Sequence, residues 1–362
     1  EFGDWRLFES FRPGKDGVAS RQPIVVVRNR FGEAPPVQRG RSVPKRYRRA
    51  ALQPLLDGLR SQGFAVEVLE ADATLPWRLR NTARQYRHLP RVLNFAGGMQ
   101  GAGRRSWVPA CCEMLGLAYS GPAPQSPALW DDRRAQLDLL EGAGLATPRR
   151  LSVADACRQL AAGRVSVVVR PRREADRAGK RLTRTHLLER EVARLRDRGE
   201  EPLIEADAGG QRVTVVIFGG TEGRPIPPVL LEHSKRGWIE ATTPDAAAAG
   251  ELVGAALLAC STFECRGLAR VDLEIDAGGR ITVWQVDALP LPGRKSALHA
   301  ALAIRGLTFA DFGCLLIDGA DATPDDADAD PLAQDRRHED RRSKFSITPT
   351  ESKHAIFLPT SS

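Results

Sequence analysis

Polar residues that could carry chemistry alternate along two neighbouring segments late in the sequence. One valine separates Arg270 from Asp272, and another separates Gln285 from Asp287. Alternate residues of a strand share one face, so pairing these segments as a hairpin would bring the four side chains together. Two carboxylates and an amide oxygen suit a hard cation such as Mg²⁺, and a guanidinium beside them could balance an anionic intermediate. The alternative is that they are ordinary solvated positions on a half-exposed sheet.

A second set of residues places basic side chains at the ends of expected elements. Arg133 stands near the start of a leucine-rich helical segment, Arg170 ends a valine-rich strand, and Lys235 follows an apolar stretch. Cations in such places suit the binding of a polyphosphate. Taken singly, each is more often a surface charge.

The elements that would position these residues begin with a parallel unit. Leucines at i, i+3, i+4 and i+7 predict a helix over 52–59, between two short apolar strands. This strand–helix–strand order predicts parallel strands joined by a right-handed crossover. A Pro-rich stretch at 121–127 marks a domain boundary. The other elements expected in this half are strands at 23–28, 64–69 and 91–95, a helix at 108–116 and a short strand or turn at 118–121.

The second half of the sequence predicts helices mixed with antiparallel strands. The turn residues 276–279 separate two β segments, 267–275 and 280–287, as in a hairpin. The remaining expected helices are 129–142, 185–198, 244–262 and 296–304, and the remaining expected strands are 165–170, 202–205 and 212–218.

Length and composition indicate a globular protein with more than one domain. A chain of 362 residues exceeds one compact core, and 42% hydrophobic with 27% charged residues excludes a mostly disordered protein. No apolar run approaches the ~20 residues of a membrane-spanning helix, and no secretory signal is visible, so we expect a cytoplasmic protein with no membrane partner. The six scattered cysteines lack paired spacing and are expected to be reduced thiols.

The charge distribution favours anionic partners. The net charge is +8, but residues 318–362 hold ten acidic and six basic residues, so the rest of the chain carries +12. The composition of 318–362 predicts a mostly disordered acidic tail. A basic run at 39–49 could contact nucleic acid, yet no recognised nucleic-acid module surrounds it, so we expect no nucleic-acid partner.

These elements, in this order, resemble the ATP-grasp superfamily and, within it, the D-alanine–D-alanine ligase group. The resemblance covers roughly residues 23–310. It implies an α+β ATP-grasp fold in which an N-terminal parallel α/β lobe (23–122) precedes two α+β lobes (123–208 and 209–317) that clasp the nucleotide, after an extension at 1–22. The segments that carry it are Val92–Phe95, Val108–Gly121, Asp132–Arg133, Leu139–Pro148, Val167–Pro171, Leu203–Glu205, Val213–Val215 and Ala269–Asp272.

The resemblance implies an ATP-dependent ligase that joins a small-molecule carboxylate to an amine through an acyl phosphate, with Mg²⁺, or Mn²⁺ in its place, as metal. Arg270 matches an arginine that steadies the acyl phosphate. Ser296 falls near a serine that receives a substrate carboxylate. Dimers are common among similar ligases, and the sequence leaves a homodimer open. The residues matched to ATP binding are Arg133, Arg170, Glu205, Ala208 and Lys235, and those matched to the metal are Asp272, Gln285 and Asp287.

The sequence departs from the family pattern at several of these positions. Arg133 and Arg170 replace lysines, and Arg212 replaces an acidic residue that binds ribose. Gln285 and Asp287 stand where the family has Glu and then Asn. These departures motivate an alternative function, in which a catalytically impaired ATP-grasp relative serves as a nucleotide-binding or scaffold module.

Overall fold

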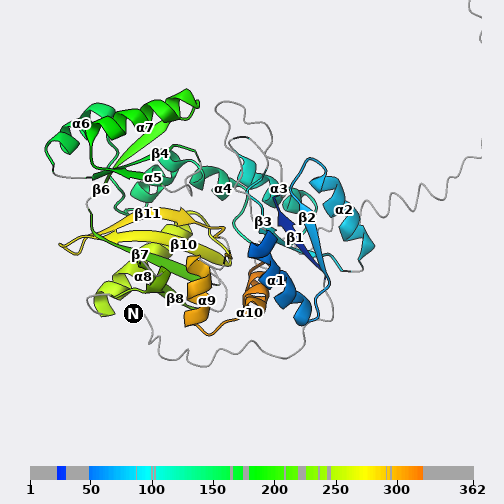
Figure 1. The fold of residues 1–362 in the computed structure, drawn as a ribbon. Helices are drawn as coiled ribbons and strands as arrows, with labels where there is room; N and C mark the ends of the chain where they lie inside the picture. The colour runs from blue at the N-terminus through cyan, green and yellow to red at the C-terminus, as the bar shows by residue number, and fades with distance from the viewer. Residues whose placement is uncertain are drawn as a thin grey trace, which may run out of the picture. The chain divides into compact units, whose positions relative to one another are not determined.

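Three β-sheets organise the described part of the chain in the computed structural model (Figure 1). All of the described residues belong to one compact unit. The extension at 1–22, the basic run up to residue 48 and the tail from residue 321 lie outside them. The structure describes residues 23–29, 49–86, 88–98, 101, 103–163, 166–173, 179–207, 209–218, 226–234, 237–242, 246–290, 292–293 and 296–320.

The first sheet is parallel and has the strand order β2-β1-β3. The central strand β1 is apolar and pairs on both sides, with Ile24 opposite Val66 in β2 and Arg91 in β3. The expected parallel unit is thereby confirmed. Helix α2 was not expected, although Leu75, Leu79 and other buried residues follow a helical spacing. The elements are β1 (Ile24–Arg28), α1 (Arg49–Ser61), β2 (Val66–Glu70), α2 (Leu75–Gln85), β3 (Arg91–Phe95), the 3₁₀ helix η2 (Arg104–Ser106) and α3 (Trp107–Met114).

The second sheet is antiparallel, has the order β5-β4-β6 and carries Arg170 and Glu205. Helices α6 and α7 lie along one side of it (Figure 1). Leu160, Leu188 and Val167 are among the buried side chains that join these helices to the sheet. We call the segment from α4 to β6 the central lobe. Its elements are α4 (Gln125–Trp130), α5 (Arg133–Gly142), α6 (Val153–Ala161), β4 (Ser166–Pro171), β5 (Lys180–Leu182), α7 (Thr185–Asp197) and β6 (Pro202–Asp207).

The single helix expected at 129–142 is wrong, because two helices meet there. Asp132 adopts an extended backbone between α4 and α5, and its carboxylate accepts hydrogen bonds from the backbone N–H groups of Arg134 and Ala135. An aspartate in this position is a favourable N-cap, so it starts a new helix instead of continuing the old one. Arg133 therefore becomes the first residue of α5.

The third sheet is antiparallel, with the order β11-β10-β7-β8-β9. The expected hairpin is confirmed, since β10 and β11 pair with Val271 opposite Val286. Helix α8 covers one face of this sheet through its buried residues, among them Leu252 and Ala256. The elements are β7 (Gln211–Phe218), β8 (Ile226–Ser234), β9 (Gly237–Glu240), α8 (Ala246–Thr262), β10 (Leu268–Ile275), β11 (Ile281–Asp287), α9 (Ala297–Ile304) and α10 (Phe309–Ala320).

The other face of the third sheet changes from apolar to polar along its length. In β7, Val216 and Phe218 belong to a core shared with the first sheet, α9 and α10, whereas Arg212 and Thr214 precede them on the same face. Strand β10 runs the other way, so Asp272 is paired with Thr214 at the polar end. One strand pair thus contributes both to the core and to a polar surface where a ligand could bind.

Helix α10 packs on α1 at very close range (Figure 1). A Cβ added at Gly58 would lie 2.7 Å from the backbone N of Ala310, and one added at Gly313 would lie 2.5 Å from the Leu59 side chain. Glycine is therefore required at Gly58, where a side chain would meet backbone, and a side chain at Gly313 would have to displace the buried Leu59. Helix α10 ends at Ala320, past the start of the tail expected at 318.

The described residues hold no single helix that is both long and apolar enough to cross a membrane. The pair α9 and α10 passes on length and composition when taken together, although its helices are bent by 103°.

Candidate active site

The hairpin cluster, which we define as Arg270, Asp272, Gln285 and Asp287, is brought together as the sequence predicts. Arg270 is paired with Asp287 and Asp272 with Gln285, so the four side chains share one face. The Arg270 guanidinium lies 3.3 Å from Asp272 and 4.0 Å from Asp287. The valines between them are buried on the opposite face, which fixes the register.

A β-bulge follows this pairing. Asp272 is paired with Gln285, but the next pair is Leu273 with Val283, so Trp284 is an extra residue on β11. Bulges of this kind redirect side chains and are common next to active sites. Here the bulge lets Trp284 stack under Arg212, whose guanidinium carbon lies 3.6 Å from the ring centroid.

The oxygen atoms of the hairpin cluster are held in place by neighbours. The Thr214 hydroxyl donates to Oδ1 of Asp272 at 2.7 Å, and the Leu289 backbone N–H donates to Oδ1 of Asp287 at 3.1 Å. Gln285 is only 7% exposed, and its Nε2 has no hydrogen-bond partner among the described residues. A buried amide left unsatisfied is costly, which argues against ordinary solvated positions and for a site that a ligand completes.

The donor set of the cluster fits a hard divalent cation. Asp272 and Asp287 supply carboxylate oxygens, and Gln285 supplies an amide. Among the described residues, no three His, Cys, Asp or Glu side chains lie close enough to hold a metal ion. A metal here would therefore need the Gln285 amide oxygen or ligand oxygens as well as the two carboxylates.

The buried triad, which we define as Arg133, Glu205 and Arg170, occupies the central lobe. Arg133 Nε lies 2.5 Å from one oxygen of Glu205, and Arg170 Nε lies 3.3 Å from the other. Arg133 and Glu205 are 0% exposed. Glu205, which the resemblance matches to an adenine-facing acid, therefore has both oxygens turned to arginines in this structure.

The triad and the hairpin cluster lie within electrostatic reach of each other. Burial, together with the charges of Arg133 and Arg212, lowers the pKa of Arg170 to about 10, although the carboxylates of Glu205 and Asp272 oppose that shift. At this pKa Arg170 is still a cation at neutral pH. It therefore keeps the positive charge that attraction of an anion requires.

Gln136 links the two clusters and was missed by sequence reasoning. Its Oε1 accepts a hydrogen bond from Arg133 Nη1 at 2.6 Å, and its Nε2 donates to the Val286 carbonyl, between Gln285 and Asp287, at 3.1 Å. Gln136 is fully buried. Residues three apart on a helix are neighbours, so the spacing from Arg133 was the signal that could have found it.

Arg212, at the expected ribose position, is enclosed by carboxylates. It pairs with Asp207 at 3.0 Å and with Glu274 at 2.6 Å, and both acids are buried. Arg181 also pairs with Asp207, at 2.6 Å. Sequence reasoning missed both acids. Glu274 is brought to Arg212 by the pairing of β10 with β7, whereas Asp207 ends β6 in another sheet, five residues before Arg212.

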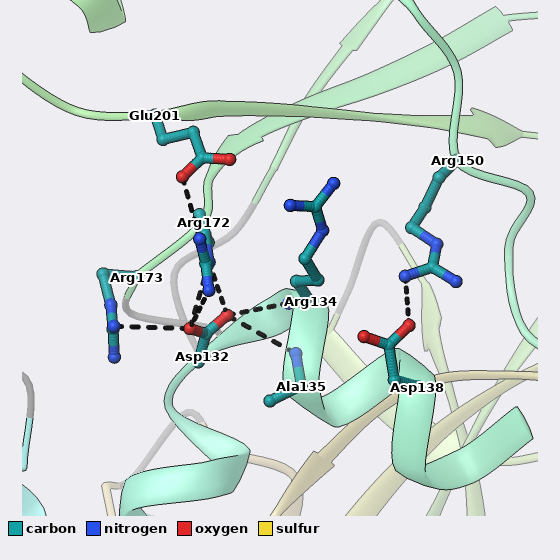
Figure 2. A network of polar contacts seen from close by, with 8 residues as sticks. All are labelled: Asp132, Arg134, Ala135, Asp138, Arg150, Arg172, Arg173 and Glu201. Atoms are coloured by element: carbon teal, nitrogen blue, oxygen red, sulfur yellow. Dashed lines mark hydrogen bonds and ion pairs between the residues drawn. The ribbon is translucent and has the colours of Figure 1, made fainter. Parts of the chain in front are cut away.

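Asp132 is the centre of a network of contacts with arginines (Figure 2). Besides capping α5, it accepts hydrogen bonds from Arg172 at 2.9 and 3.0 Å, and Arg173 lies 3.4 Å away. Arg172 also pairs with Glu201 at 3.0 Å. Although burial opposes it, hydrogen bonding from Arg172 and the charges of both arginines hold the pKa of Asp132 below its ordinary value.

Of the other matched residues, Ser296 has a local capping role, and two lie outside the described residues. Ser296 is the N-cap of α9, where its hydroxyl donates to the Gly293 carbonyl at 2.7 Å and accepts from the His299 backbone N–H at 3.2 Å. Ala208 and Lys235 lie outside the described residues. All six cysteines are described, and each is a free thiol.

Comparison with known proteins finds distant relatives by sequence and similar folds among solved structures. No family model matches the sequence. An uncharacterized protein of Sinorhizobium fredii is 27% identical over 247 residues, which are 63% of this chain and 72% of that protein. The D-alanine–D-alanine ligase of Desulforudis audaxviator is 26% identical over 278 residues, 70% of this chain and 87% of the ligase.

Solved structures of the same kind match the fold. The ATP complex of D-alanine–D-alanine ligase from Bacillus anthracis has a TM-score of 0.64 at 19% identity, covering 89% of this chain and 100% of that one. The chain has the ATP-grasp fold of these ligases and resembles them in sequence at low identity. The ATP-grasp fold expected from the sequence is thereby confirmed, and VanG D-Ala:D-Ser ligase from Enterococcus faecalis, with a TM-score of 0.59 at 15% identity over 83% of this chain and 99% of that one, shares it.

Proposed function

We propose that this ATP-grasp protein is an ATP-dependent carboxylate–amine ligase that forms a peptide or amide bond. The observation that carries the proposal is the register of β10 and β11, which sets Arg270 against Asp287 and Asp272 against Gln285 on one face. The ATP-grasp fold and the named ligases among its relatives support the same reaction class. The two substrates would be small molecules, one with a carboxylate and one with an amine.

The proposed reaction has two transfers. A carboxylate oxygen of the first substrate attacks the γ-phosphorus of ATP, the bond to the β-phosphate oxygen breaks, and ADP leaves. The amine then attacks the acyl carbon, loses a proton, and inorganic phosphate departs with the C–O bonding electrons. Arg270 would face the negative charge that develops on the acyl phosphate, because it lies beside both carboxylates of the hairpin cluster.

Asp272, Gln285 and Asp287 would hold Mg²⁺, and Mn²⁺ has the same ligand preference. When bound, the metal would neutralise phosphate charge during transfer. Arg170 would contact the phosphates from the central lobe, and Lys235 would join it as the resemblance implies. Arg133, which is fully buried, would act through Arg170 and Gln136 and not by direct contact.

Measurement of ADP release tests the ligase proposal. The full-length protein, incubated with ATP, Mg²⁺ and mixtures of amino acids and dipeptides, should release ADP and phosphate in equal amounts with a new amide product. Arg270→Gln should lower the turnover number by about 10²–10³-fold, because one preorganised charge at the developing anion is lost. No ADP with any mixture, together with no thermal shift by ATP, would remove the support for this function.

A second candidate function is nucleotide binding without turnover. The observation that favours it is the buried triad, in which both oxygens of Glu205 already face arginines. A family glutamate is also absent at Gln285. Saturable binding of Mg²⁺ and ATP with no ADP release would support this function, and a gain of turnover in Gln285→Glu would identify a decayed enzyme.

A further inference from the structure

The hairpin cluster carries its own cation between its two carboxylates. Arg270 reaches Oδ2 of Asp272 and Oδ2 of Asp287, while the Oδ1 atoms are occupied by Thr214 and by a backbone N–H. The guanidinium thus faces the second oxygen of each carboxylate. A divalent cation bound by the same two oxygens would need the guanidinium to move aside.

We infer that Arg270 is a built-in counter-ion that keeps the metal site closed until an anionic ligand draws the guanidinium away. This inference rests on the metal role proposed for Asp272 and Asp287. It adds a consequence for binding, namely that the divalent cation and the phosphates bind tightly only together. Arg270 would exchange two carboxylate partners for a phosphate as the metal takes its place.

The contacts around Arg270 suit such an exchange. Its distances of 3.3 and 4.0 Å to the carboxylates are longer than the 2.5 Å contact between Arg133 and Glu205. The side chains of Arg270 and Asp272 are 25% and 27% exposed, so water can solvate the guanidinium as it leaves. The unpartnered Nε2 of the buried Gln285 is a second sign that the cluster is completed by a ligand.

Charge explains why the arginine would oppose a metal that arrives alone. A guanidinium within about 4–5 Å of the site repels a divalent cation even at high dielectric, and it also reduces the negative potential of the carboxylates. A phosphate that accompanies the metal reverses both effects, because it attracts the guanidinium and supplies oxygen ligands.

The test measures Mn²⁺ binding to the full chain in the absence of nucleotide, from the electron paramagnetic resonance signal of free Mn²⁺. Arg270→Met should bind Mn²⁺ at least about tenfold more tightly than the unmodified protein, because the competing charge is gone. Arg270→Lys retains the charge and should stay within about threefold of the unmodified protein. Arg270→Gln replaces the Met variant if that variant fails to fold, as judged by circular dichroism.

A matched control is available on the surface of the central lobe (Figure 2). Arg150 also pairs with two carboxylates, those of Asp138 and Glu141. Arg150→Met should therefore leave Mn²⁺ affinity unchanged if the effect belongs to the hairpin. An unchanged affinity in Arg270→Met, or an equal gain in Arg150→Met, would overturn the inference.

The outcomes separate this inference from the proposed function. A gain in Mn²⁺ affinity in Arg270→Met supports the counter-ion role of Arg270, whether or not the unmodified protein releases ADP. An absence of ADP release with every substrate would count against the ligase function only. If the unmodified protein releases ADP but Mn²⁺ affinity does not differ between the variants, the ligase function is supported and the counter-ion role of Arg270 is excluded.

Discussion

The buried triad and the hairpin cluster both pair arginine with carboxylates, but the Arg270–Asp272 pair is more exposed than the Arg133–Glu205 pair. In the triad, Arg133 and Glu205 are removed from water entirely, and helix α5 and strands β4 and β6 hold the pairs from three sides. In the hairpin cluster, Arg270 and Asp272 keep about a quarter of their side chains exposed. Solvent access therefore decides whether an ion pair stays fixed or can exchange its partner for a ligand.

The energetic reason lies in desolvation. Removing one member of a buried ion pair leaves an uncompensated charge in a low dielectric, whereas an exposed partner is readily replaced by water. The triad is therefore expected to govern the stability of the central lobe. The hairpin cluster is expected to govern ligand binding and to add little to stability.

The largest expected effect is that of Glu205→Gln. It leaves Arg133 and Arg170 buried without a carboxylate and should lower the free energy of unfolding by about 3–5 kcal/mol in urea denaturation. The matched control is Glu201→Gln, which removes the exposed partner of Arg172 and should cost less than about 1 kcal/mol. Equal losses of unfolding free energy in the two variants would contradict the distinction between buried and exposed ion pairs.

A smaller effect is expected where Gln136 joins the two clusters. Gln136→Met leaves a donor of Arg133 and the Val286 carbonyl unsatisfied, which should lower the free energy of unfolding by about 1–3 kcal/mol. Amide hydrogen exchange in β11 should also become faster.

Leu140→Met is the control for this substitution, since it changes a buried apolar residue on the same helix. A volume-conserving change of this kind should cost less than about 1.5 kcal/mol and leave exchange in β11 unchanged. If β11 exchanged equally fast in both variants, Gln136 would be an ordinary core residue and not a link.

The hairpin cluster should tolerate a change that the triad does not. Asp272→Asn should alter the free energy of unfolding by less than about 1 kcal/mol, because the pair is partly exposed and Arg270 keeps Asp287 as a partner. A loss as large as that of Glu205→Gln, measured in the same urea series, would show that the cluster is structural.

The smallest expected effect is on the stability of the folded protein at acidic pH. Hydrogen bonding from Arg194, followed by Lys180, lowers the pKa of Glu191 from 4.5 to about 2, although burial opposes the shift. A depressed carboxyl pKa stabilises the folded state above the unfolded pKa, and that stabilisation is lost as the pH falls from about 5 towards about 2. Both partners are substantially exposed, so the contribution should be less than about 1 kcal/mol.

Glu191→Gln should therefore show a smaller fall in urea midpoint between about pH 5 and about pH 3 than the unmodified protein. Its neighbour Glu189 is exposed, so Glu189→Gln serves as the control and should follow the unmodified protein. An identical fall in all three proteins would contradict the role given to Arg194 and Lys180.

Local patterns in the sequence were sufficient to predict the elements whose apolar and polar residues alternate regularly. The alternation around Val271 and Val286 predicted the hairpin and the shared face of Arg270 and Asp272, because strand geometry depends only on neighbours along the chain. The break at Asp132 was missed, since capping competes with a continuous leucine pattern and the helical pattern was given priority.

Contacts that depend on tertiary packing could not be predicted in this way. Glu205 meets Arg133 across 72 residues, and Gln136 meets Val286 across 150 residues. The resemblance matched Glu205 to an acid that faces adenine, whereas both of its oxygens face arginines in this structure. Strands β8 and β9 and helix α10 were also missed, and α10 is set by its packing on α1.

The most direct measurement is the binding of ATP with Mg²⁺, by isothermal titration calorimetry, to the unmodified protein, Asp287→Ala and Asp138→Ala. We expect saturable binding to the unmodified protein and at least about tenfold weaker binding to Asp287→Ala, since an oxygen ligand of the metal is lost. We expect no change in Asp138→Ala, whose carboxylate pairs with Arg150. No binding to the unmodified protein, or equal binding to Asp287→Ala, would contradict the proposed site.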